Sequence, residues 1–257
     1  MTDPKNIENR LNFTAKVSAW AKADPLFTTR SFTGAEAVFS GSSTTTFNAL
    51  VLDPSCKRGA FKIIDQARSE LFDGNPFAVW SWQDGQLQNL PVQADAVEEM
   101  RVMTATVADL KQRAANQEVL ETTLVQHSAH LMDVGSVIAD VFGEDPEGIM
   151  VQSIYAAQED ASILDLKIEY RLAYENGIAA ATGSFILRDG IAGIYDISVR
   201  PNLQKQGLGS KMFDAILARA IGQGATSFTL QASTDSANIY ERAGFKTVGY
   251  CWCLDID

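Results

Sequence analysis

The chain has few of the residues that build disulfide frameworks and metal sites. Its 257 residues include three cysteines and two histidines. An odd and sparse set of cysteines does not form a disulfide framework, so we expect Cys56, Cys251 and Cys253 to be reduced residues of a cytoplasmic protein. His127 and His130 lie three apart, a spacing that can hold a metal ion, but no third ligand completes a zinc pattern. We therefore expect no metal.

Long apolar runs and positive charge are also scarce. No uninterrupted apolar stretch approaches the ~20 residues that span a bilayer, and the first residues lack the features of a secretory signal. We therefore expect no membrane partner. The chain carries 21 Lys and Arg against 32 Asp and Glu, a net charge of −11. Since phosphate backbones attract Lys and Arg, this balance argues against a nucleic-acid partner. An apolar fraction of 46% is typical of a globular protein with a core.

A glycine-rich turn between a strand and a helix is the most informative motif. Residues 194–199 are β-branched and aromatic enough for a strand, and residues 212–221 have apolar side chains at helical spacing. The intervening loop contains Gly207 and Gly209. Such glycines leave backbone N–H groups uncovered at a helix N-terminus, where the dipole attracts anions. The motif predicts a site for a phosphate-bearing cofactor, although a tight turn without a ligand has the same pattern.

Two other kinds of phosphate loop fit this motif poorly. A dinucleotide-binding fingerprint needs a third glycine at the position of Met212. A nucleoside-triphosphate loop needs Gly-Lys-Ser/Thr, whereas the order here is Gly209, Ser210, Lys211. The acyl-CoA loop remains.

The segment resembles the GNAT acetyltransferase superfamily, in which a strand ending in Val precedes Gln/Arg-x-x-Gly-x-Gly/Ala and a helix. Gln204, Gly207 and Gly209 match this pattern position by position. Residues 239–245 resemble the second signature of the family, a helix that carries a tyrosine and ends in Gly-Phe. The resemblance implies an α/β chain with an α+β mixed sheet, a GNAT fold in its C-terminal half, and acetyl-CoA as the acyl donor.

Apolar periodicity and turn formers predict the elements of the chain. The expected helices span 5–22, 58–72, 87–95, 109–115, a stretch that ends at 142, 146–157, 212–221 and a stretch that ends at 243. The expected strands span 26–32, 35–39, 47–52, 77–82, 100–107, 165–174, 178–187, 194–199, 227–232 and 245–254. Asn-Gly at 176–177 and Asp-Gly at 189–190 predict type I′ hairpin turns.

The first half of the chain repeats the order of elements of the second half. This repeated order of helices and strands predicts a tandem arrangement, with a degenerate GNAT-like domain at 1–120 and a catalytic GNAT domain at 121–257. Residues 54–59, where a phosphate loop would lie, have one glycine, so we assign no cofactor binding there. The N-terminal half would instead cover the catalytic half, shape the acceptor pocket or form the contact of a homodimer.

The resemblance also implies the roles of individual residues. Tyr240 would protonate the departing thiolate, and Asp196, the titratable carboxylate of the motif strand, would be the base. Some relatives have a glutamate where this chain has Gly193, so a water-mediated route or a structural Asp196 stays open. Ser233 stands where relatives often have a cofactor-binding asparagine. The implied cofactor contacts are Ile197, Ser198 and Val199 to pantetheine, Gln204, Lys205, Gln206, Gly207, Leu208, Gly209 and Ser210 around the pyrophosphate, and Ser233.

Residues 114–166 contain ten Asp and Glu and no Lys or Arg. One interpretation is a solvated acidic surface. The other uses the resemblance: this region lines the acceptor side of a GNAT domain, where anionic walls attract a cationic amine. The predicted function is N-acetyl transfer from acetyl-CoA to a small amine, which would be cationic under the second interpretation. A non-catalytic acyl-CoA-binding regulatory protein and an acetyltransferase of protein amines are the alternatives.

Overall fold

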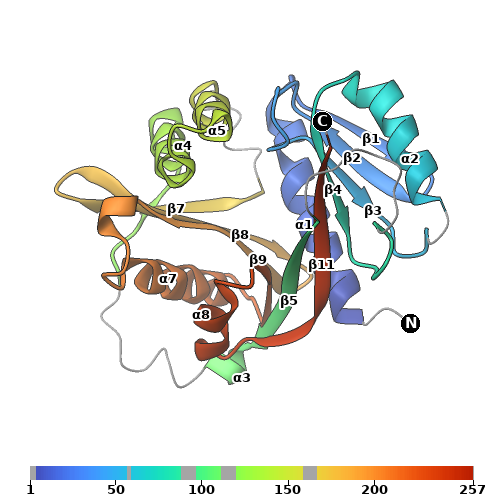
Figure 1. Ribbon diagram of the computed structural model, residues 1–257. Helices are drawn as coiled ribbons and strands as arrows, with labels where there is room; N and C mark the ends of the chain where they lie inside the picture. Colours follow the sequence, from blue (N-terminus) through green and yellow to red (C-terminus); the bar gives the residue numbers. More distant parts are fainter. Residues whose placement is uncertain (1–3, 57–58, 88–96, 111–119, 159–166, 257) are drawn as a thin grey trace. The chain divides into compact units, whose positions relative to one another are not determined.

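The computed structural model describes residues 4–56, 59–87, 97–110, 120–158 and 167–256. The chain forms two compact units, which are drawn in Figure 1. Unit 1 comprises Met1–Met103, Gln231–Asn238 and Thr247–Asp257, and unit 2 comprises Thr104–Leu230 and Ile239–Lys246. The domain boundary near residue 120 stays a prediction.

Unit 1 is a sheet with helices, and its strands follow the order β1-β2-β3-β4-β11-β5. Its helical elements are α1 (Pro4–Ala23), α2 (Ala60–Ala67) and the π-helical turn η1 (Arg68–Phe72). Its strands are β1 (Thr28–Phe32), β2 (Ala35–Phe39), β3 (Ala49–Leu52), β4 (Phe77–Ser81), the first part of β5 (Glu98–Thr106) and nearly all of β11 (Lys246–Ile256).

The first three strands of unit 1 pair antiparallel, and α2 then connects β3 to β4. Strands β3 and β4 pair in parallel, with Ala49 opposite Ala78. Strand β11 runs antiparallel to β4, with Trp252 opposite Ser81 and Ile256 opposite Phe77. The C-terminal strand of the chain therefore completes the sheet of the N-terminal unit.

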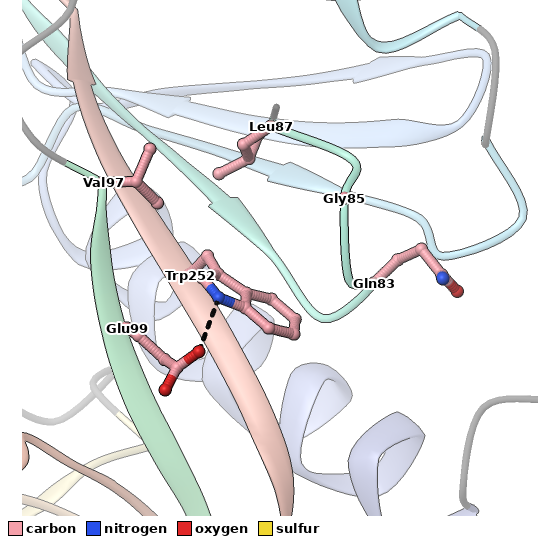
Figure 2. Close-up of a pocket in the computed structure, with 6 residues that line it drawn as sticks. All are labelled: Gln83, Gly85, Leu87, Val97, Glu99 and Trp252. Carbon is pink, nitrogen blue, oxygen red and sulfur yellow. Dashed lines mark hydrogen bonds between the residues drawn. The ribbon is translucent and has the colours of Figure 1, made fainter. Parts of the chain in front are cut away.

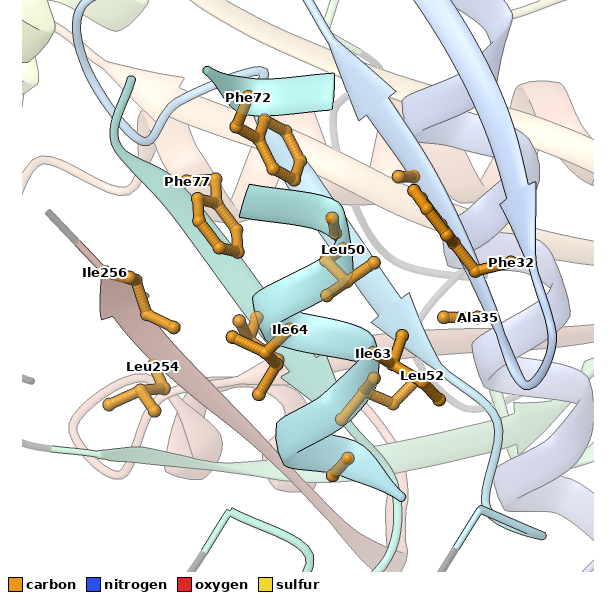
Figure 3. Close-up of a cluster of buried hydrophobic side chains, with 14 of the residues drawn as sticks. Phe32, Ala35, Leu50, Leu52, Ile63, Ile64, Phe72, Phe77, Leu254 and Ile256 are labelled. Atoms are coloured by element: carbon orange, nitrogen blue, oxygen red, sulfur yellow. The ribbon is translucent and has the colours of Figure 1, made fainter. Parts of the chain in front are cut away.

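The core of unit 1 lies between α2 and the sheet (Figure 3). Ile64 of α2 and Leu50 of β3 are both essentially inaccessible to solvent. The rings of Phe72 and Phe77 stack with centroids 4.1 Å apart. On α1, Phe13 packs against the indole of Trp80 at a centroid distance of 4.5 Å. Burial of apolar area at roughly 25 cal/mol per Å² stabilises this packing.

In unit 2 the strand order is β10-β9-β8-β7-β6, with the end of β5 next to β10. Its helical elements are α3 (Val107–Leu110), α4 (Ser128–Phe142), α5 (Pro146–Ala156), the 3-10 turn η2 (Pro201–Leu203), α7 (Leu208–Gly222) and most of α8 (Ala237–Arg242). Its strands are β6 (Thr123–Leu124), β7 (Glu169–Glu175), β8 (Ile178–Arg188), β9 (Ile191–Val199) and β10 (Ser227–Ala232).

Unit 2 repeats the topology of unit 1. Strands β7, β8 and β9 pair antiparallel, and α7 then connects β9 to a parallel neighbour, β10. Helices α4 and α5 lie on one face of this sheet and α7 lies on the other (Figure 1). The expected mixed sheet and the expected repetition of elements are both confirmed.

Most of the expected elements lie within a few residues of their predicted bounds, with three local differences. Phe47 does not belong to β3, because it has a φ of 70° and the strand begins at Ala49. The helix expected to run to 72 changes to a π-helical turn at Arg68. Helix α7 begins at Leu208, so Leu208, Gly209 and Ser210 form its first turn. Residues 88–95 of the helix expected at 87–95 and the end of the helix expected at 109–115 lie outside the described residues, as does the start of the strand expected at 165–174.

No helix in the described part of the chain is both long enough and apolar enough to cross a membrane.

Candidate active site

Strand β9 contains a bulge at Asp196. Between the pairs Thr182–Ser198 and Ser184–Tyr195, two residues of β9 lie opposite the single residue Gly183 of β8. Asp196 has a φ of 56°. A Cβ atom at Gly183 would lie 2.6 Å from Cδ1 of Ile197, so a larger residue opposite the bulge would displace that side chain. Bulges of this kind redirect a side chain and interrupt pairing.

The first half of β9 pairs with β10. The parallel register joins Ile191 to Ser227, Ala192 to Phe228 and Gly193 to Thr229. Residues 197–199 lie beyond the last of these pairs. The sequence implied that backbone groups at these positions contact pantetheine, and the short register is consistent with that prediction.

The loop between β9 and α7 contains two residues with left-handed backbone. Lys205 has a φ of 62° and Gly207 has a φ of 85°. A Cβ atom at Gly207 would meet no atom within 4 Å, so this glycine faces open space. Gly209 is closer to the sheet, since its Cβ would lie 3.4 Å from Cγ2 of Val199. A free approach to the main chain at Gly207 is what an anion at this helix terminus needs.

Helix α7 presents its first N–H groups at this loop. The N–H of Lys211 donates to the carbonyl of Gly207 at 3.1 Å and begins the helical ladder. The amides of Leu208, Gly209 and Ser210 precede that bond, in the turn where an α-helix has no intrahelical acceptors. Gly207 caps the helix without a side-chain hydrogen bond. The helix thus offers donors and a positive dipole end to an anionic ligand.

Two glutamine side chains shape the loop. The amide of Gln204 donates to the carbonyl of Val199 at 3.0 Å, and the amide of Gln206 donates to the carbonyl of Asn202 at 3.3 Å. Gln204 therefore closes the loop onto the end of β9. Its predicted role in cofactor binding stays a prediction.

Tyr240 lies on α8 and packs on α7. Its ring centroid is 5.2 Å from that of Phe213 and 6.3 Å from that of Phe245. Burial raises the pKa of Tyr240 above its usual value. Within the described part of the chain its hydroxyl has no hydrogen bond. A protonated, uncommitted hydroxyl is suited to donate a proton, as the sequence predicted for this residue.

The carboxylate of Asp196 is held by a hydroxyl of β8. The Ser184 side chain donates to Oδ2 of Asp196 at 2.7 Å. Tyr155 of α5 lies near this carboxylate. The pKa of Tyr155 is raised mainly by burial, and the negative charge of Asp196 adds to the rise. The hydroxyls of Tyr155 and Tyr170 are 3.2 Å apart. Asp196 therefore projects toward the α5 side of the sheet, into a group of hydroxyls.

Sequence reasoning missed these hydroxyl partners. Ser184, Tyr155 and Tyr170 come from three different elements, and they belong to no motif. A buried tyrosine on a helix is ordinarily a packing residue, so the sequence carried no signal for the group.

Ser233 has a local structural role. Its carbonyl accepts hydrogen bonds from the amides of Ser236 and Ala237, and its hydroxyl is 2.9 Å from that of Ser236. It belongs to unit 1, whereas Tyr240 and the loop belong to unit 2. Its predicted cofactor contact stays a prediction.

The two histidines lie at the start of α4. His127 precedes the helix, and its ring centroid is 5.2 Å from that of His130. In the described residues no three His, Cys, Asp or Glu side chains gather as a metal site. All three cysteines are free thiols.

Several acids of the 114–166 segment have structural partners. Asp133 accepts from the hydroxyl of Tyr174 at 2.7 Å, and Asp140 forms an ion pair with Arg200. Asp145 caps α5 by accepting from the amide of Glu147 at 3.0 Å. These three carboxylates therefore stabilise unit 2, whatever further role their charge has.

The counterpart loop of unit 1 is filled by protein groups. The Gln86 amide donates to the carbonyls of Asp53 and Cys56, both at 3.1 Å. The carboxylate of Asp53 accepts from the amide of Ser55 at 2.8 Å and pairs with Arg10 at 3.3 Å. Burial alone would raise the pKa of Asp53, but these hydrogen bonds and Arg10 lower it. An ionised carboxylate here repels phosphate.

Unit 1 has a separate cavity of about 260 Å³, shown in Figure 2. The indole N–H of Trp252 donates to Glu99 at 3.2 Å on one side of it. The lining residues are Gln83, Gly85, Leu87, Val97, Glu99 and Trp252. The volume falls below the ~300 Å³ at which small-molecule sites begin.

Comparisons with known proteins agree with this geometry. Residues 139–251 match the family model of the acetyltransferase (GNAT) domain. No curated protein sequence matches the chain significantly.

Solved structures share the fold over nearly the whole chain. A functionally unknown conserved protein from Staphylococcus epidermidis ATCC 12228 is 17% identical, with a TM-score of 0.63, and the match covers 88% of this chain and 92% of that one. A GCN5-related N-acetyltransferase from Kribbella flavida is 13% identical, with a TM-score of 0.59, covering 96% of each chain. A tandem GNAT protein from the clavulanic acid biosynthesis pathway is 12% identical, with a TM-score of 0.61, covering 94% of this chain and 86% of that one.

Residues 139–251 therefore match a GNAT acetyltransferase domain, and the solved structures share the fold of the chain as a whole. The matched domain lies in the C-terminal half of the chain, and the fold of the whole chain is similar to that of a tandem GNAT protein.

Proposed function

We propose that the chain transfers an acetyl group from acetyl-CoA directly to the amine of a small acceptor. One observation carries the proposal: the first turn of α7 presents its amides at Gly207, whose main chain faces open space. The residues fit the pyrophosphate of CoA, since the exposed Lys205 and Lys211 add positive charge to the helix dipole.

Residues 197–199 of β9 would contact the pantetheine arm, which acetyl-CoA extends from the loop along the strand. Ser198 is partly accessible and Val199 is buried, so the contact at Val199 would come from its main chain. Asp196, at the bulge, directly precedes this stretch in β9.

The chemistry needs an uncharged amine, and a proton for the sulfur that leaves. In this proposal Asp196 accepts the proton of the amine, directly or through water, while Ser184 holds the carboxylate in place. Tyr240 donates its proton to the thiolate. No nucleophilic side chain is required, because the amine attacks the acyl carbon itself.

The acceptor in this proposal is a small amine that is cationic in solution. Asp196 supplies one negative charge, and the net charge of −11 adds to the attraction. The acidic segment contributes in the same sense, although Asp133 and Asp140 already have partners.

Thermal unfolding with and without acetyl-CoA, followed by a thiol-release assay against a panel of amines, tests the proposal. Stabilisation together with amine-dependent CoA release is the expected result. Stabilisation without release for any amine would favour an acyl-CoA-binding regulatory protein. Release with intact proteins but not with small amines would favour a protein acetyltransferase.

A further inference from the structure

Arg200 occupies the junction between β9 and the loop, and all its side-chain nitrogens have partners within unit 2. Nε donates to the carbonyl of Ala179 on β8 at 2.5 Å, and Nη2 donates to the hydroxyl of Ser136 on α4 at 2.8 Å. Nη1 forms an ion pair with Asp140 of α4. The main-chain N–H of Arg200 donates to the carbonyl of Ala180 at 3.0 Å.

These contacts fix the start of the loop. The carbonyl of Arg200 accepts from the amide of Leu203 at 2.9 Å and so closes the turn η2. Gln204 then bonds back to Val199. The guanidinium therefore anchors, against β8 and α4, the first turn of the segment that leads to Gly207.

The same contacts leave Arg200 poorly placed to bind phosphate. The guanidinium is planar, and a phosphate would have to displace the Asp140 carboxylate or the Ala179 carbonyl. The side chain is 18% exposed, and Asp140 neutralises its charge. In contrast, Lys205 is exposed and lies within the loop itself.

We propose that Arg200 is a positioning residue that holds the loop at residues 201–207 against β8 and α4, and that it is not a ligand of the pyrophosphate. The part that concerns CoA rests on the proposed function. The part that concerns the loop can be tested on the protein without any ligand.

Limited trypsin digestion provides the ligand-free test. Lys205 is exposed in the loop, whereas the Arg200–Pro201 bond resists trypsin because proline follows. Arg200→Lys keeps the charge but cannot reach three partners in one plane. We expect cleavage after Lys205 to be about tenfold faster in Arg200→Lys, because the charged hydrogen bonds no longer oppose opening of the loop.

Arg219→Lys is the matched control. Arg219 lies at the other end of α7, and its Nε also pairs with a carboxylate, that of Glu169, at 2.8 Å. Its replacement should leave cleavage after Lys205 unchanged. Ser136→Ala, a milder change on α4, should give a smaller acceleration than Arg200→Lys. Unchanged cleavage in both Arg200→Lys and Ser136→Ala would overturn the proposal.

Calorimetric titration with CoA separates a positioning role of Arg200 from a phosphate-binding role, because the two roles predict opposite changes in the Kd for CoA when Asp140 is replaced. If Arg200 positions the loop, Asp140→Ala releases its anchor, and the Kd for CoA rises, by about tenfold. If Arg200 binds phosphate, Asp140→Ala frees the guanidinium, and CoA binds more tightly. Tighter binding would overturn the proposal. A wild-type protein that fails to bind CoA would refute the proposed function, and the trypsin result would then decide the role of Arg200.

Discussion

The side-chain hydroxyl of Ser184 donates a 2.7 Å hydrogen bond to the carboxylate of Asp196, across a bulge in which Asp196 has a φ of 56°. The bulge and the hydroxyl together fix the direction of the one carboxylate on β9. The sheet thereby presents an oriented carboxylate directly before the stretch proposed to contact pantetheine.

Replacing Asp196 by Asn should lower kcat by about 10²-fold or more, the usual contribution of a general base. Asn tolerates the left-handed backbone and can keep the bond to Ser184, so the fold should persist. Steady-state kinetics with the acceptor found by the amine screen measure the effect.

Asp189→Asn is the matched control for this substitution. Asp189 has a similar φ, 51°, but lies in the exposed turn between β8 and β9. Its kcat should equal that of the wild type. Equal activity of Asp196→Asn and wild type would exclude Asp196 as the base.

Replacing Tyr240 by Phe should reduce kcat by about 10²-fold while acetyl-CoA binding stays unchanged. The introduced phenyl ring should keep the contacts with Phe213 and Phe245, because only the hydroxyl is lost. Comparing kcat with the Kd for CoA separates the two effects. Tyr250→Phe, a change at an exposed tyrosine of unit 1, is the control.

The raised pKa of Tyr240 determines how stability and kcat should change with pH. Burial raises the pKa of Tyr240 above 10.0, so the folded protein retains the phenolic proton where the unfolded chain begins to lose it. Its contribution to stability is complete below pH 10 and falls as the pH rises through the folded pKa. The alkaline fall of kcat should therefore occur above pH 10 when Tyr240 is the acid, and a fall near pH 8 would assign that role elsewhere.

Replacing Gly207 by Glu should abolish stabilisation by acetyl-CoA. A ligand at a hundred times its Kd adds about 2.7 kcal/mol, which corresponds to roughly 5–10 °C in Tm for a chain of this size. The introduced carboxylate would occupy the open approach to the α7 amides and repel phosphate.

Gly224→Glu controls for charge and backbone strain. Gly224 also has a positive φ, 97°, and a Cβ atom there would meet no atom within 4 Å. It follows the other end of α7. This variant should lose stability to a similar extent but keep the full shift with acetyl-CoA. Loss of the shift in both variants would remove the loop as the specific cause.

Alanine substitutions at two glycines should have different effects on the free energy of unfolding. A Cβ at Gly135 of α4 would lie 2.5 Å from Cβ of Tyr155 on α5, so Gly135→Ala should destabilise the protein by about 1–3 kcal/mol. Gly222, in the last turn of α7, has no atom within 4 Å of that position. Its replacement should be neutral or stabilise by up to about 1 kcal/mol. Urea denaturation compares the two, and equal effects would contradict the close packing of α4 on α5.

The proposal of a cationic acceptor predicts a salt effect. Raising the ionic strength from 0.01 to about 0.15 M shortens the Debye length from roughly 30 to 8 Å. The KM of a cationic amine should therefore rise, whereas that of a neutral analogue should change little. Equal changes for both would refute the charge argument.

The sequence predicted the elements and the loop because local chemistry determines them. The hairpin turns have the left-handed pairs that Asn-Gly and Asp-Gly indicate, with φ values of 51° and 79° at Asn176 and Gly177. The expected strand at 227–232 coincides with β10. The positive φ of Gly207 likewise follows from its place before a helix.

Contacts between distant segments could not be predicted in this way. Arg200 and Asp140 are 60 positions apart and meet only because α4 packs on the sheet near the end of β9. The bulge at Asp196 depends on Gly183, in a different strand, and no local pattern marks it. The place of β11 in unit 1 also depends on pairing across most of the chain.

Strand β11 has a consequence for biosynthesis. Its partner β4 is translated long before the eleven residues of β11 leave the ribosome. Until then the edge of β4 can pair with other chains, which favours aggregation. The N-terminal half should therefore depend on completed synthesis, and a fragment that stops before residue 246 should be less soluble than the full chain.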